Sequence, residues 1–211
     1  MTGEPYAKST IEAYLARLSS AEPEPGGGSA AALVGAMAAA LVSMVSNLTL
    51  GRDKYMGVQE QMAEIKMNAE FALARLADLI TTDALAYGLV AQAMKLPKGT
   101  PEENKARGAA LQGALVDATE VPLEIAETSA EVARLALPAA ELGNASAASD
   151  AAVAAVLADA AAQAAALNVK INLGWIEDPG FAGEVWSRVE TVLCETAHLR
   201  DTILSVTYAK L

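Results

Sequence analysis

The feature that most constrains this chain is a run of 27 consecutive residues without a charge, between Glu24 and Arg52. The run reads PGGGSAAALVGAMAAALVSMVSNLTLG. A stretch of this length can span a membrane, cradle a phosphate behind its glycines, or form a buried helix that follows a turn. Which of the three structures it adopts decides what class of protein the chain belongs to.

The composition of the run favours the buried helix. Its apolar residues are mainly alanine, which contributes little to membrane insertion, and serine, asparagine and threonine interrupt them. The GGGS sequence lacks the Lys-Ser/Thr pair of a phosphate loop, and no strand pattern precedes it. We therefore expect a turn that leads into a helix N-terminus, whose unpaired N–H groups can face an anion or a carbonyl.

Spacing within the run predicts a helix with two apolar faces. The bulky face comprises Leu33, Met37, Leu41, Met44 and Leu48, and the small face comprises Ala32, Gly35, Ala36, Ala39, Ser43 and Ser46. Two such faces are typical of a helix buried between neighbours on both sides, and small-residue stripes also suit a helical dimer interface.

Helix start signals recur along the rest of the chain. Ser9 and Glu12 form a capping box for a first helix that ends near Ser20, and a long helical pattern covers about residues 58–94. Thr100, followed by Pro101 and Glu103, has the N-cap, first-turn proline and capping-box partner of another helix start.

The second half of the chain continues the helical pattern. Pro122 is expected to bend or divide the helix that begins after Thr100, and Pro138 with Gly143 is expected to end it. Another helix covers about residues 149–173, and Asp178 opens a last one that reaches towards residue 211. We expect an all-α bundle of long, partly kinked helices, forming one domain over residues 1–211.

Composition and charge further narrow the class of protein to which the chain can belong. The chain is 53% hydrophobic but only 4% aromatic, which fits closely packed alanine-rich helices, and its abundant apolar surface predicts a homodimer. A formal charge of -11 argues against a nucleic-acid partner. The single Cys194 cannot form an intramolecular disulfide, and the N-terminus lacks a basic, then apolar, leader, so we expect a cytoplasmic protein.

Several blocks of the sequence resemble a known family. They are PEPGGGSAAALVGAMAAALVSMVSNLT followed by GRDKY, then TDALAY, LPKGTPEEN, VPLEIAE, GNASAASDA and NVKINLGWIED. In this order they resemble the cyclodeaminase/cyclohydrolase family, which includes methenyltetrahydrofolate cyclohydrolases and the cyclodeaminase part of formiminotransferase-cyclodeaminase. The resemblance implies an α-helical homodimer that acts on one-carbon tetrahydrofolates, with no metal and no cofactor beyond the folate substrate.

Two reactions follow from that resemblance. A cyclohydrolase hydrolyses 5,10-methenyltetrahydrofolate to 10-formyltetrahydrofolate, whereas a cyclodeaminase closes a formimino group onto the neighbouring nitrogen and releases ammonia. Both pass through a tetrahedral carbon and both use proton transfer, which a single acid/base group can supply. A helical protein that binds folate or a partner without catalysis is the alternative of another class.

Asp83 is the candidate acid/base. It lies in an apolar segment with Leu79, Ile80 and Tyr87, where desolvation is expected to raise the carboxyl pKa towards neutrality. The structural alternative is that the TTD sequence caps a helix that restarts there. The match of TDALAY to the family favours the catalytic role.

The candidate substrate-binding residues come from four parts of the chain. The turn supplies Gly26, Gly27, Gly28 and Ser29, with a close backbone approach to the ligand expected at Gly27 and a capping role at Ser29. The block GRDKY supplies Arg52, Lys54 and Tyr55, and Lys98 follows in a later loop; these cations can bind the carboxylates of folate or can be ordinary solvated charges.

The remaining candidates are amides and one carboxylate. Asn144 and Asp150 lie at a helix junction, where capping alone would explain them, but the family block suggests that Asp150 faces the ligand. Asn168 and Asn172 are one helical turn apart and so share a face, where they can bind a pterin or bridge a subunit contact. Cys194 and His198 are too few for a zinc site, and no metal is expected.

Overall fold

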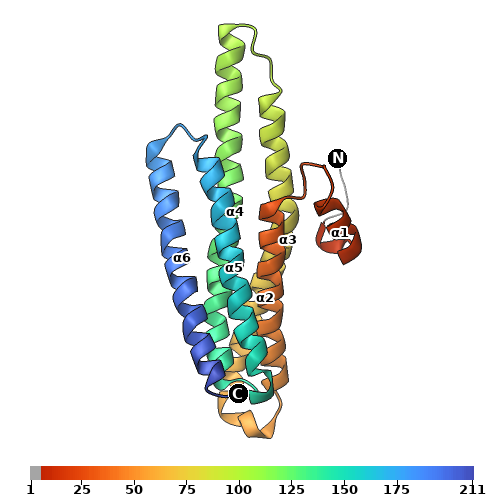
Figure 1. Ribbon diagram of the computed structural model, residues 1–211, viewed down its shortest axis with the longest axis vertical. Helices are drawn as coiled ribbons and strands as arrows, with labels where there is room; N and C mark the ends of the chain where they lie inside the picture. The colour runs from red at the N-terminus through yellow and green to blue at the C-terminus, as the bar shows by residue number, and fades with distance from the viewer. Residues whose placement is uncertain (1–5) are drawn as a thin grey trace.

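The computed structural model describes residues 6–211, and helices are the only regular secondary structure among them (Figure 1). Six α-helices and three short 3-10 helices follow one another: η1 (Tyr6–Lys8), α1 (Ile11–Leu18), α2 (Gly27–Thr49), η2 (Asp53–Val58), α3 (Gln59–Met94), α4 (Pro101–Leu142), η3 (Ala145–Ala147), α5 (Ala148–Leu173) and α6 (Pro179–Tyr208). The expected all-α helical bundle is confirmed.

The four helices α2 to α5 run up and down beside one another and enclose the core. Helix α6 lies against α4 and α5, and α1 packs beside the N-terminal end of α2 (Figure 1). Helices α3 and α4 extend beyond the other helices at one end and form a long hairpin (Figure 1). This arrangement leaves the N-terminus of α2 and the C-terminus of α5 side by side at the base of the hairpin.

Alanine fills most of the core, as the composition suggested. Helix α2 turns its small face inward, and Ala32, Ala39 and Ser46 are completely buried there. Its bulky face points outward instead, so that Met37 is half exposed and Met44 and Leu48 are more than a third exposed. The prediction that both faces are buried is therefore wrong within one chain, because close helix approach selects small side chains for the interior.

The helix starts were predicted well, with one error of a single residue. The Thr100 side chain accepts the Glu103 N–H, and the Glu103 carboxylate accepts the Thr100 N–H, which together complete the expected capping box. The first helix is capped by Thr10 and not by Ser9, whose hydroxyl donates to the Tyr6 carbonyl instead.

Pro122 does not divide α4, which continues for 42 residues through both of its prolines. A proline cannot donate to the carbonyl four residues earlier, which here is that of Ala118. The Asn172 side-chain N–H donates to that carbonyl across 2.6 Å, so the acceptor stays satisfied. The expected division is wrong for this reason, while the expected bend stays a prediction. The helix continues through Pro138 and ends before Gly143, one of the two residues predicted to end it.

Two helical segments, Gly27–Thr49 and Ala145–Leu173, are long and apolar enough to cross a membrane by length and composition alone. More than half of each apolar stretch is buried inside the bundle. Core helices of soluble proteins pass the same test, so this finding is weak evidence for a membrane span.

Candidate active site

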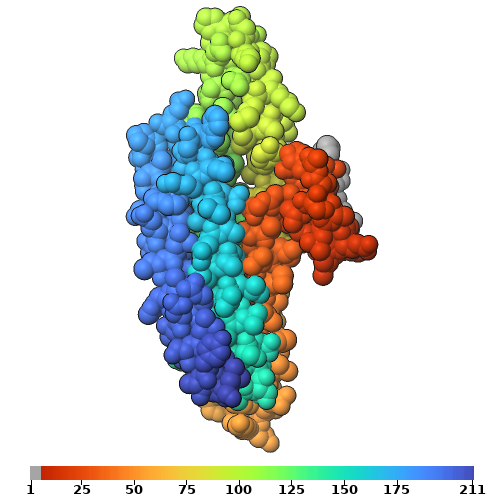
Figure 2. Space-filling view, in the orientation of Figure 1, coloured from red at the N-terminus to blue at the C-terminus, as the bar shows by residue number. Residues whose placement is uncertain are grey.

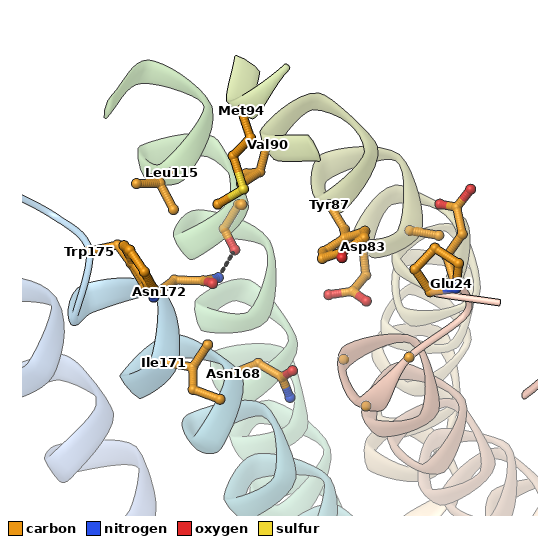
Figure 3. Close-up of a pocket in the computed structure, with 16 residues that line it drawn as sticks. Glu24, Asp83, Tyr87, Val90, Met94, Leu115, Asn168, Ile171, Asn172 and Trp175 are labelled. Carbon is orange, nitrogen blue, oxygen red and sulfur yellow. Dashed lines mark hydrogen bonds between the residues drawn. The ribbon is translucent and has the colours of Figure 1, made fainter. Parts of the chain in front are cut away.

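A pocket of about 350 Å³ opens at the base of the α3–α4 hairpin (Figure 3). Four segments that are distant in the sequence line it: the turn before α2, the second half of α3, the middle of α4 and the C-terminal end of α5. Gly26, Gly27, Gly28, Asp83, Asn168 and Asn172 are the predicted site residues among its lining. The sequence therefore identified groups that the fold brings together.

Asp83 lies against the glycine turn at the N-terminus of α2. A methyl group placed on Gly28 would lie only 2.5 Å from the Asp83 carboxyl carbon and 2.8 Å from its Oδ2, so only glycine allows this approach. A side chain on Gly27 would meet nothing closer than the Asn168 amide, at 3.5 Å. The close approach that the structure contains is thus at Gly28 and is made by a protein carboxylate, while the close approach of a ligand at Gly27 stays a prediction.

The surroundings of Asp83 raise the pKa of its carboxyl group above the ordinary value of 3.8. Desolvation by burial is the larger cause, and a hydrogen bond from the Ser29 backbone N–H partly opposes it by favouring the ionised form. Asp83 lies inside the continuous helix α3, so no helix restarts there; the backbone N–H that it accepts, that of Ser29, belongs to the first turn of α2. A desolvated carboxyl at the wall of a pocket is what an acid/base group requires.

Ser29 follows the glycine turn and links it to α1. Its side chain is completely buried, and its hydroxyl lies 3.1 Å from the Tyr14 hydroxyl of α1. The hydroxyl therefore ties α1 to the start of α2, while the Ser29 backbone N–H faces Asp83. In this structure the Ser29 backbone bonds to Asp83, and its side chain holds α1 against α2.

Asn168 and Asn172 lie on the α5 side of the pocket, opposite Asp83 (Figure 3). The Asn168 side-chain N–H donates to the Ala164 carbonyl at 2.9 Å, and that of Asn172 donates to Ala118. Neither Oδ1 accepts a hydrogen bond from the rest of residues 6–211, so both carbonyl oxygens are available to a ligand. Asn172 therefore has a structural role in addition to its place in the pocket.

Three residues that the sequence did not predict also line the pocket: Glu24, Tyr87 and Trp175 (Figure 3). Helical spacing could have found two of them, since Tyr87 follows Asp83 by one turn and Trp175 follows Asn172 by three residues. Tyr87 is about half exposed and Trp175 is 63% exposed, so their rings present apolar surface to whatever enters. Such rings can stack on a flat heterocycle.

The fold separates Arg52, Lys54, Tyr55 and Asn144 from this pocket within one chain. They line a second cleft of about 480 Å³ at the opposite end of α2, where the Tyr55 hydroxyl accepts the Ala145 N–H at 3.0 Å. The 23 residues of α2 place the two sites about 33 Å apart. These four candidate substrate-binding residues therefore do not lie in one pocket with Asp83 within a single chain.

Two further candidates also lie away from the pocket lining. Lys98 is exposed in the loop between α3 and α4, and Asp150 is in the first turn of α5, at the same end of the bundle as the second cleft. No group of three or more side chains that could hold a metal occurs among residues 6–211. The fold and the pocket together define an all-α protein with a candidate acid/base site between helix ends.

Comparisons with known proteins agree with this class. The formiminotransferase-cyclodeaminase family model matches residues 10–191. A methenyltetrahydrofolate cyclohydrolase of Methylorubrum extorquens is 43% identical over 95% of this chain and 97% of its own length. A formimidoyltransferase-cyclodeaminase of Mus musculus is 36% identical over 88% of this chain, which spans only 34% of that protein.

A solved structure is also similar. The formiminotetrahydrofolate cyclodeaminase of Thermotoga maritima is 30% identical, with a TM-score of 0.87 over 96% of this chain and 97% of that one. The chain belongs to the formiminotransferase-cyclodeaminase family.

Proposed function

We propose that this protein hydrolyses 5,10-methenyltetrahydrofolate to 10-formyltetrahydrofolate. The observation that carries the proposal is the end-to-end match to the cyclohydrolase of Methylorubrum extorquens, at 43% identity and with nearly equal lengths. The bifunctional relatives are matched over about one third of their length. The pocket around Asp83 supplies the chemistry that this hydrolysis needs.

In the proposed mechanism Asp83 first accepts a proton from water and later donates a proton to the substrate. Its ionised carboxylate first attracts the cationic methenyl group and removes a proton from water as the oxygen attacks the methenyl carbon. The protonated carboxyl then returns a proton to N5 as the C–N5 bond breaks, and the new hydroxyl loses its proton to solvent as the formyl C=O forms. A raised pKa places the carboxyl close to the range in which both transfers are efficient.

The other lining groups are proposed to hold the folate. The pterin carries N–H donors, which suit the two available Oδ1 atoms of Asn168 and Asn172. The rings of Tyr87 and Trp175 offer flat apolar surfaces for the pterin or the aminobenzoyl group. The glycine turn allows the ligand and Asp83 to share the N-terminus of α2.

Cyclodeamination of formiminotetrahydrofolate is the second candidate activity. It is favoured by the structure from Thermotoga maritima, which has the same extent and carries that name. In that reaction Asp83 would protonate the departing amine after the neighbouring nitrogen has attacked the formimino carbon. The two activities differ in whether water or an internal nitrogen attacks, and both use the same acid/base position.

We also propose that the protein is a cytoplasmic homodimer of single-domain subunits, without nucleic acid, membrane, metal or additional cofactor. The support for the dimer is the outward bulky face of α2, since exposed large side chains in such numbers usually mark an interface. The net charge of -11 supports the absence of a nucleic-acid partner.

The activity is tested by incubating purified protein separately with methenyltetrahydrofolate and with 5-formiminotetrahydrofolate, while the methenyl chromophore is followed. Hydrolysis removes the chromophore from the first substrate, and cyclodeamination generates it from the second. Protein-free reactions and the Asp83→Asn variant are the controls. No acceleration with either substrate, from a protein that binds folate, would indicate a non-catalytic binder.

A further inference from the structure

The loop between α5 and α6, residues 174–178, forms part of the pocket wall. Trp175 is the pocket residue of this loop and lies beside Asn172 on the α5 side of the pocket (Figure 3). Four of the five loop residues are exposed, and Ile176 alone is partly buried. Exposed loops are more mobile than the helices that they join, so the position of Trp175 depends on what holds this loop.

Ile176 attaches the loop to the base of the α3–α4 hairpin. Figure 2 shows the loop region, in light blue, against the yellow and green hairpin. The Ile176 side chain packs against a buried apolar cluster that consists of Ala86, Val90, Leu115 and Ala118. This contact holds one side chain of the loop, but it leaves the peptide groups on either side free to rotate.

Gln112 of α4 holds those two peptide groups. Its side-chain N–H donates to the Trp175 carbonyl at 3.0 Å, and its Oε1 accepts the Glu177 N–H at 2.9 Å. Both distances are those of good hydrogen bonds, and one planar amide makes the two together. Rotation of either peptide group would break one of these bonds, so Gln112 fixes the direction of the backbone on both sides of Ile176.

The Trp175 ring has few other contacts that could hold it. The side chain is 63% exposed, and the aromatic and cation–π contacts among residues 6–211 do not involve its ring. The Asn172 side chain donates to the Ala118 carbonyl and so holds the end of α5, but that bond lies before the loop. The direction of the ring therefore depends on the backbone that Gln112 holds.

We propose that Gln112 is a positioning residue of the active site, which holds the α5–α6 loop so that the Trp175 ring is in place to stack on folate. Gln112 lies outside the pocket lining, so it acts through Trp175 and not by touching the substrate. The proposal rests on the proposed function and adds a determinant of substrate affinity on α4. Without the amide, binding has to order the loop, and this ordering lowers the affinity.

The effect of losing Gln112 is expected in KM and not in kcat. The Trp175 ring would contact a part of folate that does not change during hydrolysis, so it stabilises the bound substrate and the transition state equally. Asp83 lies on the opposite side of the pocket, against the start of α2 (Figure 3). Gln112→Leu should therefore raise KM for methenyltetrahydrofolate about three- to tenfold, the range for one aromatic stacking contact, and leave kcat within about twofold.

A double-mutant cycle tests whether Gln112 acts through Trp175. Initial rates are measured for Gln112→Leu, Trp175→Ala and the double variant. If the ring is the only route, the double variant should have the KM of Trp175→Ala within about twofold, because neighbouring residues that act together are not additive. KM increases that multiply would overturn the proposal. Gln92→Leu, at an exposed position of the same hairpin, is the matched control and should keep the wild-type KM.

Tryptophan fluorescence tests the position of the ring without substrate. The chain has two tryptophans, so Trp186→Phe leaves Trp175 as the single reporter. In this background Gln112→Leu should increase the fast, local part of the anisotropy decay of Trp175, and Gln92→Leu should not change it. An anisotropy decay that Gln112→Leu leaves unchanged would overturn the proposal, whatever happens to KM.

The measurements separate failure of this proposal from failure of the proposed function. A wild-type protein that turns over neither folate, but whose Trp175 anisotropy responds to Gln112→Leu, would refute the function and retain Gln112 as the residue that holds the ring. An active enzyme in which Gln112→Leu has the wild-type KM would refute the positioning role alone. A lower Tm with wild-type KM and anisotropy would give Gln112 a purely structural role.

Discussion

Adding one methyl group at Gly28 is expected to push the Asp83 carboxyl group out of position. In Gly28→Ala the new Cβ would start 2.5 Å from the carboxyl carbon, whereas ordinary contacts begin at about 3.4 Å. The carboxyl carbon therefore has to retreat by about 0.9 Å, or the start of α2 has to move by the same amount. Either movement changes the position of the proposed acid/base group relative to the substrate.

The expected effects on catalysis and on folding differ in size. A misplacement of about 1 Å can lower the rate by about 100-fold. Overpacking costs about 1–3 kcal/mol, while replacing glycine by alanine in a helix returns up to about 1 kcal/mol. A net cost near 1 kcal/mol corresponds to a Tm decrease of about 2–4 °C for a chain of this size.

The assay compares kcat/KM with methenyltetrahydrofolate and the Tm of three variants. Gly28→Ala should lose about 100-fold in kcat/KM with a small change in Tm. Gly27→Ala should lose far less, because its Cβ meets only the Asn168 amide at an ordinary distance. Gly113→Ala, in an open part of α4, controls for helix propensity. Wild-type activity in Gly28→Ala would show that the position of Asp83 is not critical.

Further variants test other parts of the site. Asn172→Leu should destabilise the fold by about 1–3 kcal/mol in urea titrations, because the Ala118 carbonyl loses its donor; Asn168→Leu should cost less, since its acceptor also has an intrahelical bond. Trp175→Ala should raise KM several-fold with little change in kcat, measured by initial rates, if the ring stacks on folate. Burial raises the folded-state pKa of Asp83, so the stability contributed by its protonated form is present below pH 3.8 and is lost as pH rises through the folded pKa. Asp83→Asn should therefore melt no lower than wild type at neutral pH, with no advantage left near pH 3.8; a decrease of about 1 kcal/mol at neutral pH would instead indicate a structural carboxylate.

The sequence predicted the helices because their signals are local. The capping box at Thr100 and the N-cap at Asp178 depend on residues within one turn, and the structure contains both. The division expected at Pro122 failed because its remedy is not local: the amide that satisfies the Ala118 carbonyl comes from Asn172, 54 residues later. Helix propensities depend only on the local sequence, so they cannot predict a partner this distant in the chain.

The site was predictable in its residue types but not in its geometry. The raised pKa of Asp83 follows from apolar neighbours that are visible in the sequence. The closeness of Asp83 to Gly28 depends instead on the packing of α2 against α3, and the distance between the pocket and Arg52 depends on the length of α2. The spacing of residues along the chain contains neither distance, so the substrate-binding candidates predicted from the sequence lie at both ends of α2.

The turnover of Asp83→Asn with methenyltetrahydrofolate tests the central claim most directly. This substitution preserves the shape of the side chain and removes its ability to transfer a proton. We predict that kcat falls by about two to four orders of magnitude while folate affinity changes much less. The wild-type pH–rate profile should also show an inflection above the ordinary aspartate value of 3.8 that the variant lacks. Near-wild-type kcat with an unchanged pH profile would contradict the assignment of Asp83 as the acid/base.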